Sequence, residues 1–415
     1  MNNKIYSEVN PLRLVITHKP GIEHSFITPD NIKEKIQING KLKENPNFLL
    51  FDDIIQLKNA QMEHEEFNAI LHSFTDGNTY EFSDLLTYIM KDKSIKKNLI
   101  NECIELELKN YDNIINSKDL IKLESKLLVE TLISGYLKNK KIFTFPIPNL
   151  IFTRDIAVVI GKVLLITWNK KNVRNRENIL SKYVFSNFKG FKDLDIYDFH
   201  EKHPDLSIEG GDILILDKHR VCIGISERTT IESIKKISEL IFNQGFRSIF
   251  AVNLPKKRAY MHLDTVFTLT SENEALIYPP FLNNDDTNEI YIFKKNNEPF
   301  ISNKNLIDTL KSDGLKLKPI FCGGNSTIMQ NREQWTDGAN AFSLEPGKII
   351  CYLCNEYTIK ELSKNNYEII SSKSYLNNYE FYNNSKNKFA ITLDSSELVR
   401  GRGGPRCLTL PILRI

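Results

Sequence analysis

The chain has 415 residues, of which 41% are hydrophobic, and a formal net charge of +3, so it can bury a large core in as many as two or three domains and has no basic excess for nucleic acid. No apolar run approaches the roughly 18 residues that a membrane span needs, and residues 1–8 lack the apolar core of a signal peptide. We therefore expect a cytoplasmic protein without nucleic-acid or membrane partners, and leave open whether it forms a homo-oligomer.

The first predicted strand covers residues 11–17, and the His-Lys-Pro-Gly sequence that follows predicts a turn. A second apolar run, at 48–55, is interrupted by Asp52 and Asp53. Two carboxylates at this place fit a charged turn between strands or a loop that faces a ligand. Both interpretations stay open at this point.

A helical region follows between residues 83 and 138, where glycine is almost absent and apolar residues recur at helical spacing. Ser94 and Ser117 stand where helix N-caps belong. We predict a helical subdomain over 81–140 that is inserted into a catalytic α/β part. That part would consist of residues 1–80 and 141–415.

From residue 145 onward, pairs of short β-rich runs alternate with single helices. The first pair is a predicted hairpin over 156–167 that turns at Gly161. The second pair, at 213–225, leads into a helix capped at Thr229 or Thr230. A third round begins at His262 and a fourth covers residues 348–362. Repeated strand pairs with one helix each predict a propeller-like α/β array.

Six cysteines are scattered through the chain, at positions 103, 222, 322, 351, 354 and 407. Scattered cysteines in a long chain are not typical of a disulfide framework. Cys351 and Cys354 form a C-x-x-C spacing, but no second pair and no couple of histidines accompanies them. We therefore predict a buried strand over 349–353 in preference to a metal site.

Cys407 ends a segment rich in glycine and arginine near the C-terminus. Arg400, Arg402 and Arg406 accompany this single thiol. Nearby guanidinium groups would favour a thiolate, and the glycines would let backbone amides approach a small ligand. We interpret Cys407 as a nucleophile; the alternative is a surface turn with an incidental buried cysteine.

Three further polar clusters stand at the start of predicted strand pairs, at 149–155, 207–212 and 261–267. Strands have a period of two, so His262 and Asp264 should point to one face and into one pocket. With Cys407 and Glu209 they would supply a nucleophile, an acid/base group and carboxylates.

This set of groups suits a planar cation that is attacked at carbon, and guanidinium is the natural candidate. Two carboxylates can each accept two N–H groups of a guanidinium in fork geometry. The thiolate would attack the central carbon, and the histidine would protonate the departing nitrogen and later deprotonate water.

The motifs of these clusters closely resemble arginine deiminase, of the guanidine-modifying pentein superfamily, over almost the whole chain and in the family's order. They are L-L-F-D-D at 49–53, N-x-x-F-T-R-D at 149–155, E-G-G-D at 209–212, H-L-D at 262–264, R-E-Q-W-T-D-G-A-N at 332–340 and G-R-G-G-P-R-C at 401–407. The resemblance implies a five-bladed pseudo-symmetric α/β propeller (pentein) with an inserted helical subdomain. It also implies hydrolysis of L-arginine to L-citrulline and ammonia, without a metal or an organic cofactor.

The resemblance also implies a role for each residue that matches the family's motifs. Cys407 would form a covalent amidino intermediate, with His262 as general acid/base and Glu209 as the carboxylate that orients it. Asp155 and Asp264 would clamp the guanidinium group. The remaining contacts would come from Arg174 and Arg228 at the substrate α-carboxylate, from Asn149, Phe152 and Gly401 as further substrate contacts, and from Arg402 on a mobile loop that gates the cysteine.

Three alternatives stay open. The chain could hydrolyse another guanidine, such as a methylated arginine, or transfer an amidino group to an amine. It could also bind arginine without turnover. For Arg174 and Arg228 the alternative is a solvated charge at the start of a helix. The chain departs from the family at Leu408, where the family usually has methionine, and we expect this to alter packing more than chemistry.

Overall fold

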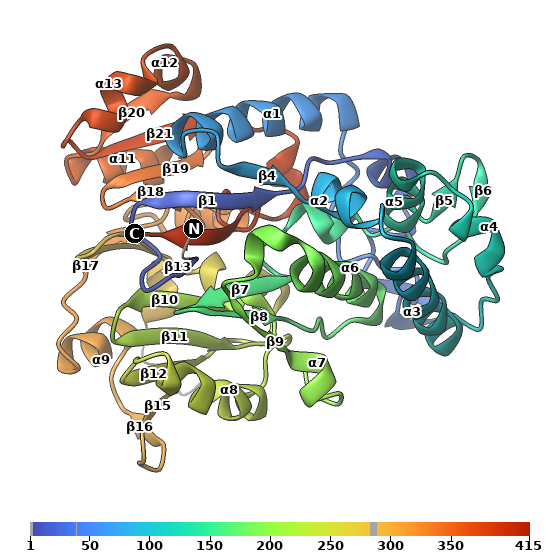
Figure 1. The fold of residues 1–415 in the computed structure, drawn as a ribbon. Helices are drawn as coiled ribbons and strands as arrows, with labels where there is room; N and C mark the ends of the chain where they lie inside the picture. Colours follow the sequence, from blue (N-terminus) through green and yellow to red (C-terminus); the bar gives the residue numbers. More distant parts are fainter. Residues whose placement is uncertain (1–2, 39, 283–288) are drawn as a thin grey trace.

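The computed structural model describes residues 3–38, 40–282 and 289–415 of the chain. Its described part belongs to the α/β class, with strands grouped into separate small sheets and helices packed around them (Figure 1). None of the helices in these ranges is long and apolar enough to cross a membrane.

Five sheets within the described residues share one arrangement: the second strand pairs antiparallel with the first and parallel with a third, and a helix lies on the connection to the third. One sheet joins β22 (Leu410–Arg414), β1 (Leu12–Thr17) and β4 (Thr79–Glu81), with helix α1 (Leu57–Phe74). The next joins β7 (Ala157–Ile160), β8 (Val163–Ile166) and β9 (Asp195–Asp198), with helix α6 (Asn175–Asn187). The predicted hairpin at Gly161 is confirmed by the pairing of β7 with β8.

The other three sheets follow in chain order. The largest joins β10 (Ile213–Asp217), β11 (Arg220–Ile225), β12 (Ser248–Asn253), β15 (Ile290–Lys294) and β16 (Phe300–Ser302), with helix α8 (Ile231–Asn243). Another joins β13 (Phe267–Ser271), β14 (Glu274–Ile277) and β17 (Lys318–Phe321), with helix α9 (Leu306–Ser312). The last joins β18 (Phe342–Glu345), β19 (Lys348–Tyr352), β21 (Phe389–Leu393) and β20 (Glu368–Ser371), with helices α11 (Glu356–Lys364), α12 (Ser372–Asn377) and α13 (Tyr379–Asn384).

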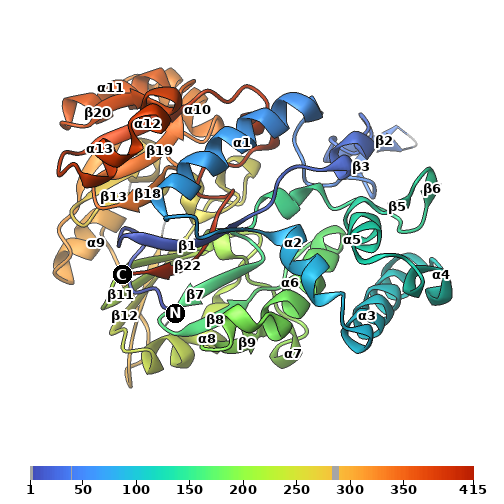
Figure 2. The same ribbon diagram turned by 45° about the horizontal axis from the view of Figure 1, so that its top comes forward.

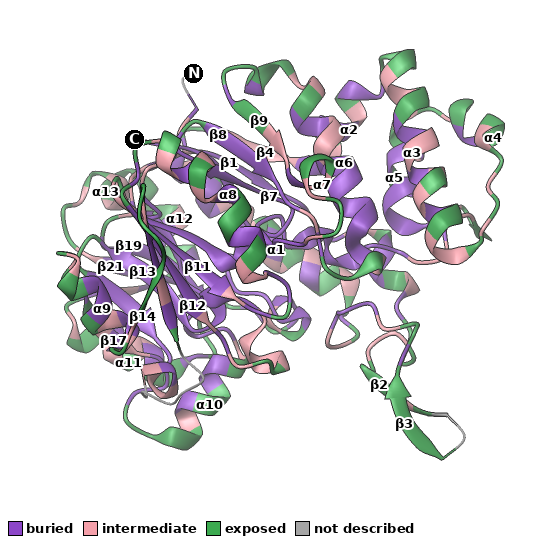
Figure 3. Cartoon of the chain, turned by 90° about the horizontal axis from the view of Figure 1, so that it is seen from below, coloured by how far each residue is buried: buried purple, intermediate pink, exposed green. Residues whose placement is uncertain are grey.

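Most of these strands are short apolar runs because both of their faces are covered. Strands β13, β19 and β21 are buried at every residue, as strands enclosed between layers must be (Figure 3). The prediction for the C-x-x-C segment is confirmed for Cys351, which is buried in β19, whereas Cys354 lies exposed beyond the strand. Helix α8 is capped by Thr230, one of the two predicted caps.

The first of the five sheets is built from both ends of the chain. Strand β22 pairs antiparallel with β1, so the N- and C-terminal segments lie side by side (Figures 1 and 2). Cys407 stands three residues before β22. This pairing therefore carries the thiol from the end of the chain into the middle of the molecule.

The predicted helical region contains four helices, and they lie to one side of the sheets (Figure 2). They are α2 (Phe82–Ile89), α3 (Lys93–Tyr111), α4 (Ser117–Ile121) and α5 (Ser125–Ser134). Both predicted caps were wrong, because Asp92 and Asn116 cap α3 and α4 with their side chains. An acceptor at the residue before the first helical turn satisfies the free N–H groups better than a serine inside that turn. Helix α4 ends at Ile121 and α5 begins at Ser125, so the apolar residues Leu120 and Leu132 lie on two separate helices.

These helices share one apolar core with the sheet of β7 and β8, through residues such as Leu99, Cys103 and Leu132. The division into residues 1–80, 81–140 and 141–415 stays a prediction. The remaining elements are two small hairpins, β2 (Lys35–Ile38) with β3 (Lys41–Glu44) and β5 (Tyr136–Leu137) with β6 (Lys140–Lys141), and the helices α7 (Phe199–Lys202) and α10 (Thr327–Trp335). Strand β3 is exposed along its whole length, and its hairpin projects from the body (Figure 3).

Candidate active site

Four of the predicted site residues come from the segments that lead into the first strand of one of these sheets. Asp155 stands two residues before β7, Glu209 four before β10, Asp264 three before β13 and Cys407 three before β22. Asn340 stands two residues before β18 in the fifth sheet. Because the sheets repeat one arrangement, their leading segments occupy equivalent places and can meet at one site.

A small cavity of about 20 Å³ lies where these segments meet. It is lined by Leu50, Asn149, Phe152, Asp155, Arg174, Arg228, Met261, His262, Thr265, Arg402 and Cys407. Glu209 and Asp264 are fully buried directly behind His262 and Cys407. Gly401 is not in the lining; it packs where a side chain would come within 2.8 Å of the Phe51 ring.

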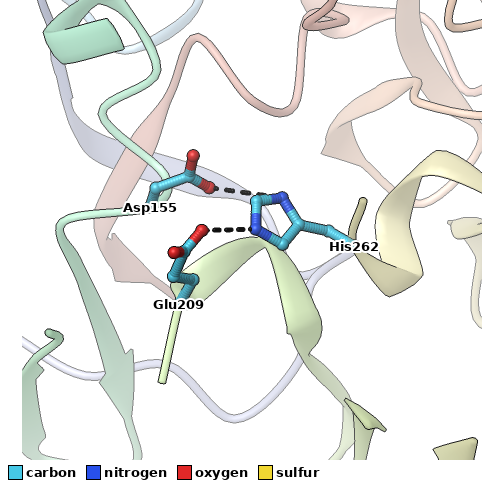
Figure 4. A group of neighbouring side chains, drawn as sticks. All are labelled: Asp155, Glu209 and His262. Atoms are coloured by element: carbon cyan, nitrogen blue, oxygen red, sulfur yellow. Dashed lines mark hydrogen bonds and ion pairs between the residues drawn. The ribbon is translucent and has the colours of Figure 1, made fainter. Parts of the chain in front are cut away.

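His262 is held between two carboxylates (Figure 4). Its Nε2 lies 2.8 Å from Glu209 Oε2, and its Nδ1 lies 3.7 Å from Asp155 Oδ1. Burial would lower the pKa of His262, but the carboxylates of Asp155, Glu209 and Asp212 outweigh it and raise this pKa from 6.5 to about 9. Gly211 makes the arrangement possible, because a Cβ there would lie 2.5 Å from His262 Nδ1. His262 is therefore a cation at neutral pH, ready to donate a proton.

The ligand atoms of Asp155, Glu209 and His262 lie within 4.8 Å of one another, a spacing that a metal ion can also use. Arg174 Nη1 lies 2.8 Å from Asp155 Oδ2, and Arg228 Nη1 lies 3.5 Å from Glu209 Oε2. These guanidinium groups already balance the two negative charges. The charge around the three residues therefore favours a protonated histidine over a bound metal ion.

The prediction that His262 and Asp264 share one face of a strand was wrong. Residues Leu263–Thr265 form a short 3₁₀ turn, and β13 begins only at Phe267. Asp264 nevertheless reaches the site, because its Oδ2 lies 3.6 Å from Cys407 Sγ. The turn sends the histidine to the cavity and the aspartate behind the thiol.

Three neighbouring arginines were predicted to favour the Cys407 thiolate; Arg406 does lower the pKa of this thiol, but burial and carboxylates outweigh it. Arg406 pairs with Glu8 and Asp264, at 3.0 and 2.7 Å, and Arg400 lies toward solvent with Asp53. Burial raises the pKa of Cys407 well above its ordinary value of 9.0, and the Asp264 and Asp155 carboxylates raise it further. Neighbours in sequence do not fix where charged side chains point: Arg406 and Arg400 are each paired with a carboxylate, and Arg402 stacks on Trp335.

Two buried carboxylate oxygens near the thiol have no hydrogen-bond partner among the described residues. They are Oδ1 of Asp155 and Oδ1 of Asp264. The other oxygen of each group is held, by Arg174 at 2.8 Å and by Arg406 at 2.7 Å. Buried acceptors are nearly always satisfied, so these two oxygens indicate where a ligand with N–H donors binds.

Arg174 and Arg228 also line the cavity, and both are only 3% exposed. The alternative of solvated charges at a helix start is therefore wrong. Arg174 already donates to Asp155, to Glu177 and to the Asn149 carbonyl. Arg228 keeps a buried Nε without a hydrogen-bond partner in the described part of the chain. This free donor suits the carboxylate of a ligand.

The loop around Asp52 and Asp53 lines the cavity through Leu50, whereas the two carboxylates pair with Arg258 and Arg400. Arg258 binds both carboxylate oxygens of Asp52, at 3.1 and 3.0 Å, and the Leu50 carbonyl at 2.9 Å. The Asn149 amide donates to the Leu49 carbonyl at 2.5 Å. Asp52 thus serves to hold a ligand-facing loop in place.

Sequence reasoning missed Asn340, although it lies in a motif that was noted. Its Oδ1 accepts the backbone N–H groups of Arg406 and Cys407, and its Nδ2 donates to the Asp264 carbonyl at 3.0 Å. It also missed Glu8, whose partner Arg406 is 398 residues away in the chain. The motif around Asn340 was a usable signal; nothing local marks Glu8.

An α/β chain that joins a buried cysteine, a histidine with a raised pKa and two carboxylates with one free oxygen each has the features of an enzyme that acts on a cationic substrate. The crystal structure of a dimethylarginine dimethylaminohydrolase in adduct with S-methyl-L-thiocitrulline resembles this fold, with a TM-score of 0.50 and 13% identity over 96% of this chain and 99% of that one. At this identity the likeness concerns the fold alone.

The sequence comparisons are more specific. The arginine deiminase family model matches residues 47–138 and 110–414. The arginine deiminase of Mycoplasma capricolum is 32% identical, over 99% of this chain and 96% of that protein. Those of Borreliella burgdorferi and Lactococcus lactis are 32% and 30% identical, over at least 97% of each protein. The chain belongs to the arginine deiminase family.

Proposed function

We propose that the chain hydrolyses the guanidinium group of L-arginine to L-citrulline and ammonia, through a covalent amidino intermediate on Cys407. The observation that carries this proposal is the pair of unpartnered buried oxygens, Asp155 Oδ1 and Asp264 Oδ1, beside the thiol. A guanidinium group placed between them would satisfy both acceptors and present its carbon to sulfur. Membership of the family supports the same substrate.

The other end of the substrate is an amino acid, and its carboxylate needs cationic partners. Arg228 offers a free buried donor, and Arg174 lines the same part of the cavity while it aligns Asp155. In this proposal Arg228 binds the α-carboxylate most directly. Asn149, Phe152 and Gly401 complete the substrate contacts, and Arg402 closes the mobile loop over them.

The proposed reaction has two halves. The bound guanidinium cation offsets the nearby carboxylates, so the Cys407 thiol loses its proton to solvent and the thiolate attacks the guanidinium carbon. His262 gives its own proton to the departing nitrogen, which leaves as ammonia. His262 then takes a proton from water, and the resulting hydroxide attacks the amidino carbon. The carbon–sulfur bond breaks, citrulline leaves and the thiolate returns. Glu209 orients His262 and stabilises its charged form, at 2.8 Å.

The resting protonation of the thiol can be tested before any turnover. Because carboxylates and burial raise the pKa of Cys407, its alkylation by iodoacetamide in the ligand-free protein should keep accelerating up to at least pH 9. The measurement requires the Cys354→Ser background, since Cys354 is the exposed one of the six cysteines. A rate that levels off near pH 7 would instead mean a resting thiolate.

We also propose that the five similar sheets form the blades of a five-bladed pseudo-symmetric propeller, with residues 81–140 as the inserted helical subdomain. The common arrangement of the sheets supports this, as does the way their leading segments supply Asp155, Glu209, Asp264, Asn340 and Cys407. Equivalent segments of equivalent blades would point toward one axis.

Comparative turnover tests the proposed substrate. Purified protein should release citrulline and ammonia in equal amounts from L-arginine, and much less product from methylated arginines or agmatine. The comparison with agmatine tests the α-carboxylate contact, because agmatine lacks that group. Faster turnover of a methylated arginine, or transfer of the amidino group to an added amine, would support the alternatives. Arginine binding without product would indicate a binding protein.

A further inference from the structure

Asp337 carries a buried carboxylate for which the proposed reaction has no use. It lies in the turn after α10 and is 3% exposed. Neither Oδ1 nor Oδ2 has a hydrogen-bond partner among the described residues. An unpaired buried carboxylate destabilises a fold, so a partner for this group is expected in some state of the protein.

Arg402 is the complementary group. Its guanidinium stacks on Trp335, with 3.7 Å from Cζ to the ring centroid, and its Nη1 donates to the Trp335 carbonyl at 2.8 Å. Its buried Nε and Nη2 have no hydrogen-bond partner in the described ranges. Asp52 lies 3.8 Å from Nε, which is too long for a hydrogen bond. Arg402 is therefore fixed to the turn that contains Asp337 and keeps two free donors.

The two free donors form one edge of the guanidinium, and other buried arginines here use this edge to bind carboxylates. Arg258 binds Asp52 through Nε and Nη2, and Arg406 binds Glu8 through the same two atoms. Two parallel N–H groups match the two oxygens of a carboxylate. Arg402 has this edge free, and Asp337 has both oxygens free.

We propose that Asp337 is the ion-pair partner of Arg402 in the substrate-bound enzyme, and thereby a positioning residue for the loop that carries Cys407. The inference rests on the proposed function, since it concerns the closed, substrate-bound state. Both residues already have left-handed backbones, with φ of +59 and +64, so the pair would join two tightly turned segments. The side chain of Arg402 would then stay over the cavity, next to the thiol.

The charges of the site agree with this pairing. Burial raises the pKa of the Asp337 carboxyl to about 7, and Arg402 is the charge that opposes this rise. Asp337 in turn is one of the carboxylates that raise the pKa of Cys407. Pairing with Arg402 would neutralise Asp337 and remove part of the field that opposes the thiolate.

A double-mutant cycle tests the pair. Asn keeps the size of Asp337 and tolerates a left-handed backbone, so Asp337→Asn removes the charge with little strain. Alone it should lower kcat/KM for arginine by at least about 10-fold, but by less than about 2-fold in the Arg402→Gln background. Both single variants should change the same parameter, kcat or KM. Independent losses that multiply in the double variant would overturn the pairing.

Two further variants keep the test decisive. Arg402→Lys retains the positive charge but lacks the two-donor edge, so its kcat/KM for arginine should fall by at least about 10-fold. This variant can be measured even if Asp337→Asn does not fold, and activity like that of the wild type would overturn the proposal. Asp52→Asn is the matched control, and its loss should persist in the Arg402→Gln background because Asp52 pairs mainly with Arg258. A wild-type chain without citrulline formation would overturn the proposed function itself, whereas multiplied losses in an active enzyme overturn only the pair.

Discussion

Citrulline formation should fall by at least about 10⁴-fold when Cys407 is replaced by serine, since removal of a nucleophile leaves only binding and electrostatic effects. The buried thiol lies 3.6 Å from Asp264, and serine has nearly the same shape, so the fold should be kept. A hydroxyl is far less acidic than a thiol and cannot form the amidino intermediate at a useful rate.

The measurement is a citrulline assay on the wild type and the variant, with arginine binding followed by calorimetry. We expect the Cys407→Ser variant to bind arginine, because the carboxylates and arginines of the cavity remain. Wild-type enzyme quenched during turnover should carry an amidino adduct on Cys407 that mass spectrometry detects. Activity within 10-fold of the wild type would remove the cysteine from the mechanism.

The second large effect is expected from Asp264→Asn. We expect kcat/KM for arginine to fall by at least about 10²-fold, because truncating one partner of a buried charge pair typically costs several kcal/mol. The substitution replaces an acceptor that the guanidinium group needs by an amide that presents N–H groups to a cation. Arg406 keeps its pair with Glu8, so the loop should stay folded.

A matched control is Asp313→Asn, which removes an aspartate from ion pairs with Arg220 and Lys294, at 2.9 Å each. Asp313 binds Arg220, Lys294 and Ser248, none of which lines the cavity, so this variant should keep its kcat/KM. Thermal unfolding of both variants separates loss of the clamp from loss of the fold. If Asp264→Asn is as active as the control, Asp264 does not bind the substrate.

Much of the secondary structure could be predicted from local sequence. The alternation of strand pairs with single helices was visible in the printed residues, and the turn at Gly161 and the cap at Thr230 agree with it. Such features depend on backbone preferences over a few residues. The predicted caps of α3 and α4 were wrong for a local reason as well, since Asp92 and Asn116 take the N-cap positions next to the serines.

For the candidate site, the sequence indicates the residue types but not their charge states. The identities of the nucleophile, the histidine and the carboxylates follow from motifs, because the reaction needs those residue types and the family shares their order. The protonation states of these residues do not follow from the motifs. Three arginines near Cys407 in sequence indicated a thiolate, but Arg406 turns to Glu8 and Arg402 stacks on Trp335.

The sequence by itself thus determined the α/β class, the family and the residue types that we propose to meet the substrate. Only the tertiary structure decided which polar and charged groups face one another. Asn340 binds the Cys407 backbone, Glu8 pairs with Arg406, and Asp337 lies near Arg402. The physical reason is that ion pairs between buried groups join segments far apart in the chain. Their geometry exists only once the sheets have packed, and no local pattern of residues encodes it.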